Sequence, residues 1–228
     1  MGGFALFAFL LSIFLLPPTH EEKKQKHAGK STGWSVLIRD KMIAGIVIMR
    51  FSYIFCIGIL WCFLPVYVDL HFNLSSAKTG VLVSIGVLLS GIIQYPMGYI
   101  ADKTDKVKMI LWGTLIIFIS MFIFIMARGF WDLFLINILF GIGGGIINPP
   151  LMAMSVIKGN NLKEMGSLMS LMTMGQSIGM FLGPFAAGFI MDFFKVEHAF
   201  ILGATVIAVF GCLFLFLTYD YQEKAIIN

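Results

Sequence analysis

Six long apolar segments dominate this sequence and limit what the chain can fold into. They hold 19 to 27 residues each, and a single arginine is their only charged residue. A helix that rises 1.5 Å per residue needs about 20 residues to cross a hydrocarbon core of about 30 Å. Strands of a membrane barrel alternate in polarity over about 10 residues, and these segments do not. The sequence predicts an all-α integral membrane protein with helices at 42–68, 79–101, 109–127, 133–157, 165–191 and 199–219.

The composition excludes the soluble alternatives. Of the 228 residues, 59% are hydrophobic and only 12% are charged. Soluble domains have about 45–50% apolar and about 25% charged residues. Disordered chains are polar and rich in charge, which excludes disorder as well. A mean hydropathy of +0.93 agrees with a protein that has little mass outside the bilayer.

A shorter apolar run opens the chain. Its 15 residues would span only about 22 Å, and no lysine or arginine precedes it, as a signal peptide would require. We interpret it as the end of a preceding transmembrane helix. The predicted organisation is therefore a helix end at 1–16, a cytoplasmic central loop at 17–41, a six-helix domain at 42–220 and a cytoplasmic tail at 221–228.

The distribution of basic residues predicts the orientation. If residues 17–41 are cytoplasmic, twelve lysines and arginines lie on that side and three on the other. Cytoplasmic loops of membrane proteins carry such an excess. We expect a multi-pass protein of the plasma membrane with a cytoplasmic carboxyl terminus and no nucleic-acid partner. The twelve are Lys23, Lys24, Lys26, Lys30, Arg39, Lys41, Lys103, Lys106, Lys108, Lys158, Lys163 and Lys224, and the three are Lys78, Arg128 and Lys195.

Catalytic patterns are absent from the sequence. The four histidines lie in predicted loops without the spacing of a metal site, and the three cysteines lie in apolar runs. No GxSxG, HExxH or glycine-rich phosphate loop occurs. We therefore expect no enzyme activity, no metal and no cofactor.

Small residues recur at helical spacing in two predicted helices. A spacing of four residues places them on one helix face, where they let two membrane helices approach closely. One interpretation is tight packing alone. The other is that these helices slide or bend against their neighbours during a conformational cycle, helped by a proline inside the helix. The residues are Gly141, Gly145, Gly175, Gly179, Gly183, Pro184, Ala187 and Gly188.

A short internal repeat predicts the architecture of the six helices. Residues 98–102 read GYIAD and residues 188–192 read GFIMD, and each segment closes the second helix of a triplet. Three crossings separate the copies, so they end on opposite sides of the membrane. This arrangement is typical of an inverted three-plus-three repeat, which is common among transporters.

The same segments resemble a known family. Gly98, Asp102, Lys103 and Lys106 follow the cytoplasmic loop motif of the major facilitator superfamily. Residues 179–188, with Gly183 followed by a proline, are similar to the GxxxGPxxGG pattern of its drug-antiporter branches. The resemblance covers about 34–220. It implies twelve helices in the whole transporter, of which this chain holds the carboxyl-terminal half, and an amino-terminal half in the same or a separate chain as partner.

The resemblance implies that the loop motif holds a cytoplasmic gate closed. Asp102 would accept hydrogen bonds from the amino terminus of a neighbouring helix, whose dipole favours an anion. Lys103 and Lys106 would pair with acidic groups or lipid phosphates. The alternative is an ordinary turn with solvated charges.

Few polar side chains lie inside the predicted helices. A charge near the middle of a membrane costs at least about 2.5–3.5 kcal/mol, so it usually faces a cavity or a partner. The arginine is close enough to the helix end to reach the interface instead. The amides either line a central cavity or form hydrogen bonds between helices. These candidate cavity-lining residues are Arg50, Gln94, Asn137, Asn148 and Gln176.

The resemblance implies a secondary active transporter of the efflux or antiporter type. It would move a small, hydrophobic or drug-like solute across the lipid bilayer by alternating access. No acidic residue lies inside a predicted helix, so the acid of a proton antiporter would have to lie in the other half. The alternative is a non-transporting or regulatory half-transporter.

Overall fold

The computed structural model describes residues 39–226, with side chains through Thr218, and all of them belong to one compact unit, 32–228. The predicted segment 1–16 and most of 17–41 lie outside the described residues. Six helices of this region are long and apolar enough to cross a membrane, and no strand occurs among the described residues. The all-α, six-helix prediction is confirmed. The helices are α3 (Lys41–Phe72), α4 (Ser76–Lys103), α5 (Lys106–Ile123), α6 (Phe130–Leu162), α7 (Met165–Phe193) and α8 (Glu197–Ile226), and a 3-10 turn, η1 (Phe124–Met126), extends α5.

Polar residues set the limits of the helices. The carboxylates of Asp40 and Asp105 cap the first turns of α3 and α5, each by accepting two backbone N–H groups. Helices α3 and α6 end at Asn73 and Lys163, which have left-handed backbone conformations with φ of 45° and 56°. Both helices run about one turn beyond their apolar segments, because charged side chains at a helix end can reach water.

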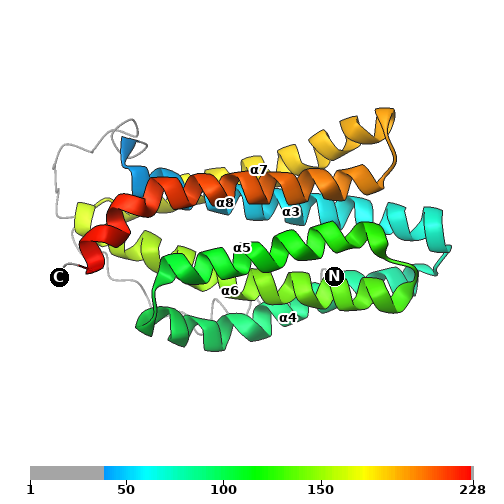
Figure 1. Cartoon of the computed structure of the whole chain (residues 1–228), viewed down its shortest axis with the longest axis horizontal. Helices are drawn as coiled ribbons and strands as arrows, with labels where there is room; N and C mark the ends of the chain where they lie inside the picture. The colour runs from blue at the N-terminus through cyan, green and yellow to red at the C-terminus, as the bar shows by residue number, and fades with distance from the viewer. Residues whose placement is uncertain (1–38, 227–228) are drawn as a thin grey trace, which may run out of the picture. The chain divides into compact units, whose positions relative to one another are not determined.

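The six helices pack as two equivalent triplets. Helix α4 packs mainly on α6 and α7 mainly on α3, while α5 packs on α6 and α8 on α3. Helices α5 and α8 also contact each other. Exchanging α3, α4 and α5 for α6, α7 and α8 leaves this pattern unchanged, as an inverted repeat requires. Figure 1 shows the result: α4 lies at the lower edge of the bundle and α7 at the upper edge.

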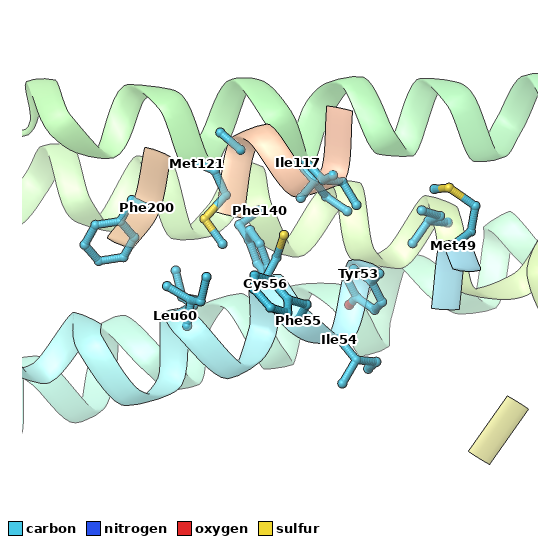
Figure 2. Close-up of a cluster of buried hydrophobic side chains, with 14 of the residues drawn as sticks. Met49, Tyr53, Ile54, Phe55, Cys56, Leu60, Ile117, Met121, Phe140 and Phe200 are labelled. Atoms are coloured by element: carbon cyan, nitrogen blue, oxygen red, sulfur yellow. The ribbon is translucent and has the colours of Figure 1, made fainter. Parts of the chain in front are cut away.

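Helix α3 forms the centre of the core. Its buried side chains extend from Met42 to Val68, and a helix that is apolar on all sides belongs in such a position. Figure 2 shows Cys56 and Leu60 of α3 with Met121 of α5 and Phe200 of α8 in the buried cluster. Phe200 also stacks on Phe124 with ring centroids 4.6 Å apart. Packing along its length therefore holds α3, the helix that carries Arg50, in place.

Ion pairs join helices at both ends of the bundle. We call the end that carries Lys41, Lys103, Lys106, Lys158 and Lys163 the lysine-rich end. There, Lys158 of α6 donates to Asp40 at the start of α3, at 2.9 Å. At the opposite end, His71 Nε2 of α3 lies 3.0 Å from Glu197 Oε1 of α8. Both contacts join α3 to a helix of the second triplet.

Candidate functional site

Arg50 forms the centre of a polar cluster between three helices. Its Nη1 donates to Asn148 Oδ1 of α6 at 2.5 Å, and its Nη2 donates to Gln176 Oε1 of α7 at 2.6 Å. The Asn148 amide in turn donates to the hydroxyl of Tyr53 at 3.5 Å. The guanidinium group is thus held by two neutral amides, one on α6 and one on the exposed face of α7.

The cluster lies near the middle of the helices. Arg50 and Gln94 each lie nine residues from the lysine-rich end of their helix, and Gln176 lies eleven residues from it. At 1.5 Å per residue these positions are about 14–17 Å deep, close to half of a hydrocarbon core of about 30 Å.

A cavity of about 280 Å³ adjoins the cluster between α3, α4 and α6. Its lining positions recur at helical spacing, because they form one face of α3 and one face of α4. The walls combine the polar cluster with aliphatic and aromatic side chains. The lining residues are Arg50, Tyr53, Ile54, Ile57, Leu60 and Trp61 of α3, Val83, Gly86, Val87, Ser90, Gly91 and Gln94 of α4, and Phe140, Gly141 and Asn148 of α6.

A second cavity continues from the first on the side of the two prolines of α6. It measures about 410 Å³ and shares Arg50, Gln94 and Asn148 with the first, adding Pro149 and Met152. Proline lacks the N–H that a helix uses, so α6 lacks backbone hydrogen bonds here although the helix continues through both prolines. Arg50 therefore borders both spaces and is the only charged side chain in either lining.

The predicted polar residues do not all gather here. Asn148 and Gln176 each accept a hydrogen bond from Arg50. Gln94 shares the cavity wall and donates to Ser90 Oγ at 3.2 Å. Asn137 is different: it is completely buried and donates to the carbonyl of Leu133 at 2.8 Å. It packs where α6 meets Gly86 of α4 and lines neither cavity.

No carboxylate balances the charge of Arg50 among residues 39–218. Their acidic side chains lie in the connections or in the first or last turn of a helix. Acidic side chains of this part lie within 4 Å of basic ones in three contacts, which join Asp40 to Lys158, Asp105 to Lys108 and Glu197 to His71. Arg50 therefore has neutral partners throughout this part of the chain.

The predicted glycines lie where helices touch. A Cβ at Gly179 would stand 2.5 Å from the carbonyl oxygen of Phe51, and a Cβ at Gly183 would meet that of Phe55, both on α3. A Cβ at Gly141 would stand 2.5 Å from the carbonyl oxygen of Gly86 on α4. Only glycine allows the backbones to approach so closely.

The remaining residues of this set follow the same two contacts. Gly175 adjoins Val47 of α3, and Gly145 adjoins Ile93 of α4. Pro184 packs against Gly58 of α3, while Gly188 has only an ordinary contact with the ring of Phe63. The α7–α3 and α6–α4 contacts are therefore equivalent, and both hold helices that carry the polar cluster.

The loop motif is arranged differently from the expectation. The carboxylate that caps α5 belongs to Asp105, which accepts from the N–H groups of Val107 and Lys108 at 2.9 and 3.3 Å. Asp102 lies in the last turn of α4 and is exposed. Lys103 bonds to the hydroxyl of Tyr99 and lies 4.1 Å from its ring centroid. Lys106 starts α5, and a Cβ at Gly98 would meet open space.

Sequence reasoning missed several wall residues. Tyr53, Ile57 and Trp61 follow Arg50 by three, seven and eleven residues, and Val87 and Ser90 precede Gln94 by seven and four. These intervals place each set on the helix face of its polar residue. Projecting the faces of Arg50 and Gln94 would have found them, whereas their residue types are common in any membrane helix.

Three kinds of similarity to known proteins agree with this fold. The family model described as Major Facilitator Superfamily matches residues 1–156 and 46–226. A multidrug resistance protein MdtG of Salmonella arizonae is 32% identical over 165 residues, covering 70% of this chain and 40% of the relative. The corresponding protein of Klebsiella pneumoniae is 32% identical over 166 residues, covering 71% and 39%. The chain thus spans about two fifths of the length of these curated relatives.

A solved structure provides the third comparison. A mutant of the peptide transporter POT, crystallised in complex with alafosfalin, has a TM-score of 0.70 with 19% identity. The match covers 79% of this chain and 39% of the transporter. At this identity the likeness concerns the fold alone.

The fold and the cluster define a six-helix membrane bundle with a polar site at mid-depth. The family model covers most of the chain, and the drug-antiporter-like motif lies within its second match. The chain belongs to the major facilitator superfamily.

Proposed function

We propose that this chain is the carboxyl-terminal half of a transporter that moves a small, hydrophobic or drug-like solute across the plasma membrane by alternating access. The amino-terminal half, in the same or a separate chain, would complete the pathway. The observation that carries the proposal is a mid-depth cavity whose walls combine Arg50 and Asn148 of the polar cluster with apolar side chains.

The exposure of this cluster supports a partner on the side of α4 and α7. Gln176 is exposed on α7 although it lies near mid-depth, and Gln94 is only partly buried on α4. Polar and charged groups are costly against lipid tails, so such groups face protein or a water-filled cavity. A second half-transporter covering this face would enclose the cluster in a central pathway.

The relatives support a drug-like solute. Proteins named multidrug resistance protein MdtG share 31–32% identity with this chain over comparable segments. The apolar wall of Ile57, Trp61, Val87 and Phe140 suits the body of such a molecule. Proton coupling would need a titratable acid from the other half, since the described acidic groups all lie near helix ends.

Efflux from cells tests the proposal. The chain, in the protein that contains it, is expressed in bacteria that lack their own drug pumps, and a panel of cationic, neutral and anionic fluorescent dyes is followed. We expect saturable, energy-dependent efflux of at least one dye. Gly183→Leu, which forces α7 away from α3, should abolish this efflux, whereas Gly80→Leu should retain it because a Cβ there meets open space.

The same measurement decides between transport and the alternative, a non-transporting half-transporter. If no dye moves while the protein is present in the membrane at the wild-type level, the transport proposal fails and a non-transporting half-transporter remains. Efflux that persists unchanged in the Gly183→Leu variant would also contradict the proposed role of the α7–α3 contact.

A further inference from the structure

We infer that Arg50 is the binding group for a negatively charged solute, which makes the preferred substrate class an organic anion with an apolar body. The inference rests on the proposed transport function and goes beyond it, because that proposal leaves the charge of the solute open. Four features of the described residues carry it: the depth of Arg50, its neutral partners, its unused donors and the cavity that it borders.

The first feature is the direction taken by the side chain. An arginine about 14 Å from a helix end can extend its guanidinium toward the interface. Arg50 instead bonds to Asn148 of α6 and Gln176 of α7, which lie near the middle of their helices. The charge therefore stays near mid-depth, where an uncompensated cation is unfavourable.

The second feature is the nature of the partners. Amide oxygens solvate a cation but do not neutralise it, and no acidic side chain among residues 39–218 forms an ion pair with Arg50. Arg50 is partly buried, and a charge that is removed from water is usually paired. Because the partners are neutral, the site favours a ligand that brings the missing negative charge.

The third feature is donor capacity. A guanidinium group carries five N–H donors in a planar fork. Two of them are used by Asn148 and Gln176, one from each terminal nitrogen. The remaining donors can bind a carboxylate, phosphonate or phosphate group, for which arginine has matching geometry.

The fourth feature is the cavity beside the guanidinium. The space of about 280 Å³ extends along α3 from Arg50 to Trp61, with Val87 and Phe140 on the facing helices. An anion at Arg50 would thus place an apolar or aromatic body against apolar walls. A solute of this kind matches both ends of the site.

A set of three probes tests the charge preference. They share a 2,4-dinitrophenyl group, which accepts energy from tryptophan: the glycine derivative is an anion, its amide is neutral, and the ethylenediamine derivative is a cation. In the complete protein in detergent, every tryptophan except Trp61 is replaced by phenylalanine, including Trp34, Trp112 and Trp131. Quenching of Trp61 then reports binding in this cavity.

We expect the anion to bind at least about tenfold more tightly than the neutral amide, as charge-assisted hydrogen bonds allow. Arg50→Gln should remove this preference, and Arg50→Lys should keep part of it, since the charge remains and the fork is lost. Arg128→Gln, the same change at the opposite end of the bundle, should leave it intact. The thermal unfolding midpoint of each variant checks that it is folded.

Equal affinity for the three probes, or preference for the cation, in the Trp61 protein would overturn the inference without any Arg50 variant. So would an anion preference that survives Arg50→Gln. The efflux measurement is independent: dye efflux without anion preference refutes only the Arg50 inference, while anion preference without efflux of any dye refutes only the transport proposal.

Discussion

At the scale of single residues, backbone contact explains the glycines of α7 better than flexibility alone. Gly179 and Gly183 lie directly against the carbonyl groups of Phe51 and Phe55. These two residues follow Arg50 in α3 by one and five positions. The spacing of the glycines predicted a close approach, and the structure identifies α3 as the helix approached. The position of α3, and of Arg50 on it, thus depends on the glycines of α7.

Gly179→Ala should destabilise the protein by about 1–3 kcal/mol, as overpacking does. The added Cβ would stand 2.5 Å from the Phe51 carbonyl oxygen, and backbone cannot move aside easily. Gly80→Ala is the control: it is helical and meets open space, so the change should be neutral or stabilising by up to about 1 kcal/mol. Thermal unfolding in detergent measures both. Equal behaviour of the two variants would contradict the packing account.

The Asp40–Lys158 pair should make stability depend on pH. Burial raises the pKa of Asp40, but the hydrogen bond and charge of Lys158, with the N–H groups of Ile43 and Met42, outweigh it and hold the pKa below its ordinary value of 3.8. A lowered pKa means that the ionised carboxylate stabilises the fold above the unfolded-state value. This contribution is lost as the pH falls through the lower pKa of the folded state.

Lys158→Met should therefore lower the unfolding midpoint at neutral pH by an amount equivalent to at most about 1 kcal/mol, as partly exposed pairs do. The difference from wild type should shrink as Asp40 is protonated below its ordinary pKa. Lys195→Met, an exposed change in a connection, serves as the comparison. A difference that stays constant down to acid pH would show that Asp40 is not the partner that matters.

At the scale of elements, the long uncharged apolar segments were sufficient to predict the helices. They did not predict which face of each helix packs against which neighbour. Apolar length identified all six, because only a helix satisfies its own backbone in lipid. The polar residues inside them could equally line a cavity or bond locally. Asn137 bonds locally, to a carbonyl of its own helix. Arg50, Asn148 and Gln176 come together only because α6 and α7 both pack near α3.

Two acidic residues at the α4–α5 connection have different expected roles: Asp105 caps α5, and Asp102 belongs to the proposed gate motif. Asp105→Ala should cost about 0.5–2 kcal/mol of stability, because it removes the cap of α5. Asp102→Ala should cost little, since Asp102 is exposed, yet it should impair efflux if the motif acts as a gate. Unfolding midpoints and dye efflux of the two variants distinguish these effects. Unimpaired efflux in Asp102→Ala would refute the gate role of that residue.

At the scale of the whole molecule, the symmetric packing of the triplets supports a rocking mechanism. The α4–α6 and α7–α3 contacts are equivalent, and the proposed rocking would move the six helices as one body against a second half. The resemblance to the family could be recognised from two motifs. The cavity between α3, α4 and α6 could not, because it depends on which faces of three separate helices meet.

Access to Ser90 from the two sides of the membrane tests whether the cavity opens alternately to each side. Ser90 lines the cavity, and Ser170 lies on an exposed part of α7 near the lysine-rich end. Each is changed to cysteine after every native cysteine of the complete protein, including Cys56, Cys62 and Cys212, has been replaced by alanine. A membrane-impermeant maleimide is then applied to right-side-out or inverted vesicles that contain the complete protein.

Alternating access predicts that Ser90→Cys is labelled from either side and that a transported solute changes both labelling rates. Ser170→Cys should be labelled from one side only. Labelling of Ser90→Cys from a single side, with or without solute, would contradict alternating access.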